Sequence, residues 1–112
     1  MTISTANTEH YTWGGNCDGW HLLKSDTLSV IQERMPAGTE ENLHYHQRAQ
    51  QVFYILSGTA VFESEGKTFE VHSMQAFHVQ PNMAHKIKNA GPDDLHFLVI
   101  SEPKAHGDRV NL

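Results

Sequence analysis

Short runs of β-branched and aromatic residues, bounded by glycine, proline, asparagine or serine, recur through most of this 112-residue chain. Clear examples are residues 51–56, which precede a turn at Gly58, and residues 59–64, which precede a turn at Gly66. Short strands separated by regular turn signals are typical of all-β sandwiches and barrels. No segment of ten or more residues has the 3.6-residue periodicity of an amphipathic helix. The sequence therefore predicts an all-β domain.

Eight strands are expected from this pattern, and the two ends of the chain fall outside it. The expected strands cover residues 21–35, 43–46, 51–56, 59–64, 68–72, 77–80, 84–89 and 95–101. Residues 13–20 contain three glycines and both tryptophans, so we predict a loop that closes one end of the domain, covers a pocket or contacts a second copy. Residues 1–12 are predicted to form an N-terminal arm, and residues 102–112 a polar tail.

Length and composition limit the function classes. A chain of this length can bury one core, so residues 1–112 are expected to form a single domain. No run of 18 apolar residues occurs, and residues 1–10 lack a secretion pattern, so no membrane span or export is expected. The lone Cys17 suits a reducing cytoplasm. The formal charge of −5, without a basic cluster, disfavours nucleic acid as a partner.

The nine histidines are scattered along the chain, and three of them have a spacing that suits a metal site. Residues two apart in a strand point to the same face, so His44 and His46 can aim both imidazoles at one point. Their Cα atoms would lie about 6.6 Å apart at the usual rise of a strand. His85 lies on another alternating run and could supply a third ring.

The positions of glycine and histidine in the first half of the chain resemble the first motif of the cupin family. That motif has a glycine, five residues, His-x-His, three or four residues, a glutamate, six residues and a second glycine. Gly38, His44, His46 and Gly58 match these positions. The glutamate position, counted back seven from Gly58, holds Gln51.

The second cupin motif is matched in part. It has a glycine, five residues, Pro-x-Gly, two residues, a histidine, three residues and an asparagine. His85 and Asn89 match, whereas Met74, Gln80 and Asn82 occupy the glycine, proline and second glycine positions. Both motifs occur in the family's order, so the chain resembles a small single-domain cupin of the cupin 2 conserved-barrel type.

This resemblance implies a fold and an assembly. Cupins are double-stranded β-helix (jelly-roll) barrels, so we expect a cupin barrel here. Cupins of this size commonly form homodimers, often by exchange of an N-terminal strand, and residues 8–24 could serve in that way.

The resemblance also implies one divalent transition metal bound by His44, His46, Gln51 and His85. Gln50 is an alternative to Gln51, which the count to Gly58 favours. A neutral amide leaves the ion its full +2 charge, which strengthens its pull on an anionic ligand but lowers metal affinity. Imidazole and amide ligands suit Zn, Ni, Fe, Mn or Cu.

A mostly apolar pocket wall is expected beside these ligands. Its predicted members are Phe53, Ile87, Phe97 and Val99.

Other polar residues are weaker candidates. His78 and His96 are either acid–base groups near the pocket mouth or surface residues. Arg34 and Arg109 are either partners for a substrate carboxylate or solvated side chains. Catalytic residues are therefore not assigned.

The expected function is that of a metal-binding cupin enzyme, in which the metal acts as a Lewis acid on a sugar acid or keto acid. The ligand set resembles that of small cupins that linearise unsaturated uronates, but those enzymes use an acid on the final strand, and residues 98–101 contain none. A non-catalytic binding or sensing cupin is the alternative. A dioxygenase is a second alternative, although many cupin dioxygenases keep the glutamate. A metal-free barrel with structural histidines is a third.

Overall fold

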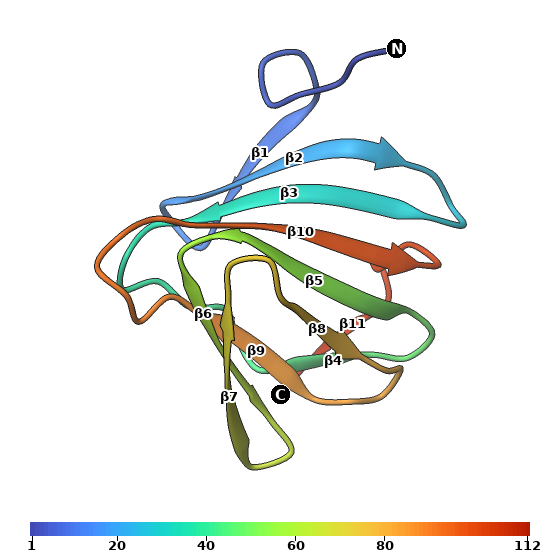
Figure 1. Cartoon of the computed structure of the whole chain (residues 1–112). Coiled ribbons are helices and arrows are strands. Elements are labelled where there is room, and N and C mark those ends of the chain that lie inside the picture. Colours follow the sequence, from blue (N-terminus) through green and yellow to red (C-terminus); the bar gives the residue numbers. More distant parts are fainter.

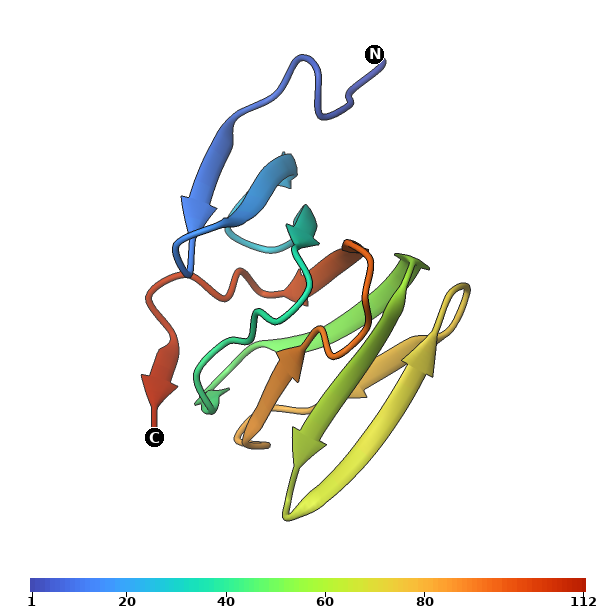
Figure 2. The ribbon, with the colours of Figure 1, turned by 90° about the vertical axis from the view of Figure 1, so that its left-hand side faces the viewer.

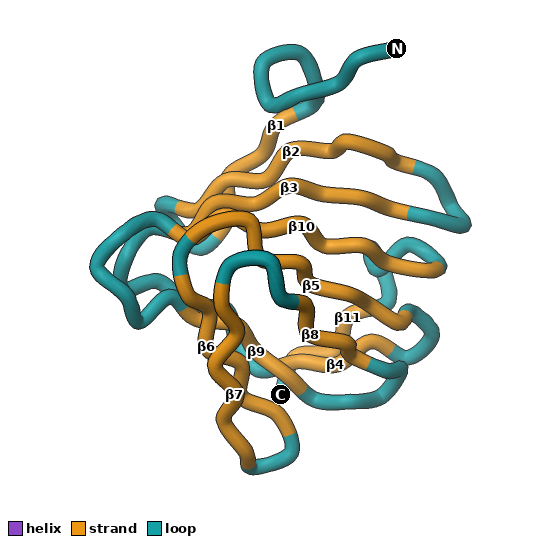
Figure 3. Tube along the Cα trace, viewed as in Figure 1, coloured by secondary structure: helices purple, strands orange, loops and turns teal.

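The computed structural model describes residues 1–112 and contains eleven strands and no helix (Figures 1 and 3). The strands are β1 (His10–Trp13), β2 (Cys17–Lys24), β3 (Ser29–Met35), β4 (His44–His46), β5 (Gln50–Ser57), β6 (Thr59–Ser64), β7 (Lys67–His72), β8 (Ala76–Val79), β9 (His85–Lys88), β10 (Leu95–Glu102) and β11 (Arg109–Asn111). The all-β prediction is confirmed. No segment forms a helix that is long and apolar enough to cross a membrane.

The strands form two antiparallel sheets that face each other. One sheet has the order β1-β2-β3-β10-β5-β8, and the other has the order β11-β4-β9-β6-β7. Figure 2 shows the second sheet with β7 at one edge and β11 at the other. Most neighbouring strands, such as β3 and β10 or β4 and β11, are not consecutive in the chain, which is the arrangement of a jelly roll.

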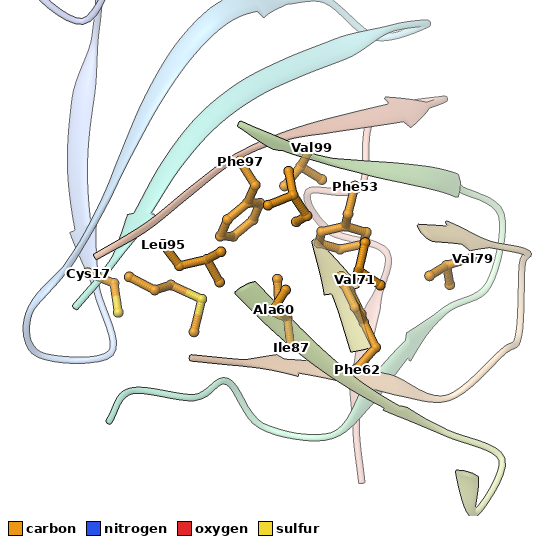
Figure 4. Close-up of a cluster of buried hydrophobic side chains, with 12 residues drawn as sticks. Cys17, Phe53, Ala60, Phe62, Val71, Val79, Ile87, Leu95, Phe97 and Val99 are labelled. Carbon is orange, nitrogen blue, oxygen red and sulfur yellow. The ribbon is translucent and has the colours of Figure 1, made fainter. Parts of the chain in front are cut away.

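Side chains from the inner faces of both sheets form the apolar core (Figure 4). Alternation along β5 and β10 buries Phe53 and Ile55 from one strand and Leu95 and Phe97 from its neighbour. Phe62 of the opposite sheet meets Phe53 edge to face, with ring centroids 5.1 Å apart. Each such side chain contributes roughly 1.5–3 kcal/mol through burial.

The loop predicted for residues 13–20 is wrong, because these residues belong to a β-hairpin. β1 pairs with β2 from His10↔Trp20 to Trp13↔Cys17. Gly14 and Gly15 have φ of 56° and 88° and form the turn, so these glycines serve a short connection rather than a long loop. Residues 10–12 of the predicted arm, residues 1–12, belong to β1, and the role of the residues before His10 as an arm stays a prediction.

The C-terminal segment is a strand rather than a polar tail. β11 pairs with β4 through Arg109↔His46 and Asn111↔His44. β11 has only three residues, and a run that short shows too little alternation to predict a strand from sequence. The pairing places the last residues of the chain beside the two histidines of β4.

Candidate metal centre

Three buried histidines converge between β4 and β9. His44 lies opposite His85 in the β4–β9 pairing, and His46 lies two residues further along the same face of β4. One ring nitrogen from each histidine lies within 4.8 Å of the others. The exposed fractions are 3% for His44, 6% for His46 and 0% for His85. The three residues could therefore hold a metal ion.

Backbone carbonyls orient two of the rings. Nδ1 of His44 donates to the Asn42 carbonyl at 2.8 Å, and Nδ1 of His85 donates to the Met83 carbonyl at 3.0 Å. These bonds leave the Nε2 lone pairs free for a ligand. Nε2 of His85 and Nδ1 of His46 are both buried, and neither has a hydrogen-bond partner. Unpaired polar atoms are costly in an interior, so a bound ion fits this site.

Burial keeps the three imidazoles in the form that binds metal. It lowers the pKa of His44 to about 3 and that of His46 to about 4, with the neighbouring histidines as further causes. Burial also lowers the pKa of His85, against the hydrogen bond to Met83. All three rings are neutral at neutral pH, which is the ligand form of histidine.

Gln51 lies in the same cavity as His44 and His46, whereas Gln50 faces outward. The Gln51 side chain is buried, and its Nε2 donates to Ser101 Oγ at 3.0 Å. Its Oε1 has no partner and is available to a ligand. The exposed Gln50 bonds instead to Glu102. Of the two glutamines, only Gln51 therefore has a side-chain oxygen available inside the cavity.

The cavity beside the histidines has a volume of about 310 Å³. Phe53 and Val99 line it, as predicted, but Ile87 and Phe97 belong to the apolar core and do not. Ile87 and Phe97 share inner faces with the cavity residues. They lie further along their strands, where the two sheets pack together and leave no space.

Three of the predicted polar candidates lie elsewhere on the molecule. His78 is exposed and contacts Gln50 on the outer face of the six-stranded sheet. His96 lies opposite Arg34 on that same face, where Arg34 binds Asp18 at 2.7 Å. Neither histidine reaches the pocket mouth, and Arg34 is not available to a substrate. These three residues alternate onto the outer face of their strands, so their side chains point away from the cavity.

The cavity contains charged and phenolic groups that the sequence reasoning did not assign to it. These groups are Tyr11, Glu33, Glu41 and His106. Arg109 was a sequence candidate and does line the cavity. Glu33 could have been found, because alternation along residues 29–35 already places it on the inner face with Ile31 and Met35.

Glu33 and Glu41 are weaker acids than ordinary glutamates, because their pKa values are raised. Burial raises the pKa of Glu33 to about 8, and the charge of Glu41 contributes in the same direction. Burial raises the pKa of Glu41 to about 7, although the charge of Arg109 opposes this rise. Both carboxyl groups can therefore gain or lose a proton near neutral pH.

We expect Glu33→Gln to stabilise the metal-free protein at pH 8. The folded protein retains the Glu33 proton that the unfolded chain releases above its ordinary pKa of 4.5. The free energy of unfolding of the wild type should therefore fall between about pH 4.5 and about pH 8, and the variant should lose less over this range. Chemical denaturation at several pH values would measure the difference.

The comparison must allow for the other ionisable side chains that line the cavity with Glu33, namely Tyr11, Glu41, His106 and Arg109. These groups are common to the wild type and the variant, so the difference between the two curves reports Glu33. Glu70→Gln, at an exposed position, serves as the matched control. Parallel curves for the wild type and Glu33→Gln would show that Glu33 ionises normally.

Fold and site together define a double-stranded β-helix protein with a buried histidine centre. The chain belongs to the cupin family, whose cupin-domain sequence model matches residues 31–101. The match covers most of the barrel, including all three histidines. The predicted family and the predicted jelly-roll fold are both confirmed.

Known proteins share this family or fold. An uncharacterized protein of Methanocaldococcus jannaschii is 29% identical over 83 residues, which cover 74% of this chain and 66% of that protein. The oxalate-binding protein of Thermotoga maritima is 28% identical over 91 residues, which cover 77% and 75% of the two chains. The structure of KdgF from Halomonas sp. superposes with a TM-score of 0.84 at 16% identity, covering 95% and 96%.

Proposed function

We propose that the chain is a metal-dependent cupin enzyme acting on a small oxygenated substrate, such as a sugar acid or keto acid. One divalent transition metal (Zn, Ni, Fe, Mn or Cu) would be held by His44, His46, Gln51 and His85. The observation that carries this proposal is the convergence of three buried, neutral imidazoles beside a cavity. The unpaired Nε2 of His85 and Oε1 of Gln51 support it.

The chemistry of the donor set fits a Lewis-acid centre. A bound divalent ion would polarise a carbonyl or hydroxyl group of the substrate. Gln51 adds no negative charge, so the ion keeps its full +2 charge and attracts anions more strongly than with a glutamate ligand. Ser101 and the carbonyls of Asn42 and Met83 fix the orientation of the ligand side chains.

The cavity suits a small anionic molecule. Its volume of about 310 Å³ lies at the lower end of the range of small-molecule sites, roughly 300–1,000 Å³. Arg109 provides a positive charge in its wall, and its side chain is 38% exposed. The relative from Thermotoga maritima is named an oxalate-binding protein, which supports a carboxylate ligand.

Glu33 and Glu41 favour an enzyme over a binding module. The last long strand, β10, presents no acidic side chain to the cavity. Its polar residue in the cavity wall is Ser101. The two glutamates come from other segments and supply ionisable groups within the same cavity. A non-catalytic binder is the second candidate, favoured by the name of the Thermotoga maritima relative. Gln51 in place of glutamate makes a dioxygenase the less favoured enzymatic function.

A turnover screen tests the proposal. Metal-loaded protein would be incubated with uronates, keto acids and phenols, and conversion would be measured by mass spectrometry. Conversion that decreases in the Gln51→Ala variant, which alters the cavity wall, would support an enzymatic function. A compound that raises the melting temperature but is never converted would instead support the binder.

We further infer a homodimer in the cytoplasm, with a small molecule rather than nucleic acid as partner. Val30, Ile100 and Val52 lie side by side on the outer face of the six-stranded sheet, all partly exposed. Two such apolar faces can pack against each other. The lone Cys17 and the formal charge of −5 support the location and the partner class. A solution mass of 12.6 kDa would contradict the dimer.

A further inference from the structure

Tyr11 and Glu33 lie in one row that crosses three strands, with Gly19 between them. Tyr11 of β1 lies opposite Gly19 of β2, and Gly19 lies opposite Glu33 of β3. A Cβ atom on Gly19 would lie 2.2 Å from Cζ of Tyr11 and 2.5 Å from its hydroxyl oxygen. The phenol ring therefore occupies the space above Gly19. The ring and its hydroxyl thus reach over Gly19 of β2, and the next strand, β3, carries Glu33.

The surroundings of Glu33 agree with this placement. Both side chains line the cavity, where burial and the charge of Glu33 raise the pKa of Tyr11. No protein group forms a hydrogen bond or an ion pair with the Glu33 carboxyl, although the side chain lies on the inner face of β3. An ionisable group without a partner in a cavity is a candidate for function rather than for structure.

Glu41 differs from Glu33 because it already has partners. Its Oε1 accepts a hydrogen bond from the Ile87 amide at 3.2 Å, and its Oε2 lies 3.9 Å from Nη1 of Arg109. Glu41 thus holds Arg109 in the cavity wall. Glu33 remains free to exchange a proton with a bound molecule.

We propose that Glu33 is the general acid–base group of this site and exchanges a proton with a keto acid or a related carboxylate substrate. The substrate carboxylate would lie against Arg109, and its carbonyl oxygen would lie towards the histidines. Tyr11 is a positioning residue beside Glu33, and Gly19 makes room for its ring. This inference rests on the proposed function, because it needs a polarised carbonyl group.

The proton transfer balances without a further reactant. The Glu33 carboxylate takes a proton from the carbon next to the carbonyl group. The electron pair of that C–H bond forms a C=C bond, and the π pair of the carbonyl moves onto its oxygen. Return of the proton from Glu33 to the same carbon reverses the step, and in a substrate with a C=C bond conjugated to the enolate, delivery to the far carbon of that bond isomerises the substrate. Nothing is oxidised or reduced.

Hydrogen–deuterium exchange into pyruvate tests the role of Glu33. Protein loaded with Zn²⁺ would be incubated with pyruvate in D₂O, and loss of the methyl proton signal would be followed by NMR. We expect the wild type to exchange the methyl protons faster than Zn²⁺ alone. Glu33→Gln should slow this exchange about 100-fold, as expected for loss of a general base. Glu70→Gln, on an exposed position of β7, should exchange at the wild-type rate.

The metal content of each sample separates the two proposals. If the wild type takes up no metal, the proposed function fails and this inference fails with it. One equivalent of Zn²⁺ with no exchange above background would overturn the role of Glu33 alone. Equal exchange by the wild type and Glu33→Gln would do the same. Gly19→Ala provides a second test, because it displaces Tyr11 but keeps every ionisable group, and it should slow the exchange without loss of Zn²⁺.

Discussion

Replacing His44 with alanine will abolish tight metal binding and the stabilisation that the metal provides. His44 is central to the site, because its ring centroid lies 4.3 Å from that of His85 and 5.1 Å from that of His46. A metal present at 100 times its dissociation constant stabilises the fold by about 2.7 kcal/mol. For a domain of this size, that free energy corresponds to a rise in melting temperature of roughly 10 °C. The variant should lose this rise.

Elemental analysis and melting curves with and without Zn²⁺ and a chelator measure this effect. His78→Ala is the matched control, because His78 is exposed on the outer face of the other sheet and should bind metal normally. If His44→Ala still holds one equivalent of metal, the histidine centre is not the metal site. If chelator changes neither protein, the histidines are structural polar groups.

Asp108→Ala will lower the free energy of unfolding by roughly 3–5 kcal/mol, as expected when a buried charged acceptor is removed. The carboxylate is 5% exposed and accepts hydrogen bonds from the backbone amides of Gln47, Arg48 and Ala49 at 2.9–3.3 Å. Removal of the carboxylate leaves the amides of Arg48 and Ala49 without partners, and leaves the Gln47 amide only the backbone carbonyl of Asp108, at 3.4 Å. The three residues connect β4 to β5, so the loss should also weaken metal binding at His46 and Gln51.

Asp108 should also contribute to the acid sensitivity of the protein. Burial alone would raise its pKa, but the hydrogen bonds from Ala49, Arg48 and Gln47 outweigh burial and hold the pKa below its ordinary value of 3.8. The stabilisation is therefore present above about pH 4 and is lost as the pH falls through the pKa of the folded state.

Urea denaturation at neutral pH measures the loss on Asp108→Ala. Asp26→Ala is the matched control, because Asp26 is 88% exposed and forms a surface ion pair with Lys104. Such pairs are worth about 0–1 kcal/mol. Equal losses for the two variants would show that the contacts of Asp108 add little.

Local pattern was sufficient to predict the histidine centre. Alternation puts His44 and His46 on one face of a strand, and the spacing of the second motif places His85 with them. The pocket wall was predicted less well, because alternation decides which face a side chain occupies but not its depth. Phe53 and Ile87 both point inward, yet Phe53 lines the cavity and Ile87 is enclosed by the core.

The sequence by itself determined the fold class, the family and the three histidines. Alternation within single strands gave the fold class and the common face of His44 and His46, and the two cupin motifs identified the family and His85. Only the tertiary structure brought Tyr11, Glu33, Glu41 and Arg109 into the cavity and set Asp108 against the turn after His46. Asp108 and Gln47 are 61 positions apart in sequence, and β11 reaches β4 only once the second sheet has formed. Contacts of this range depend on how strands pair across the barrel, which no local pattern of residues encodes.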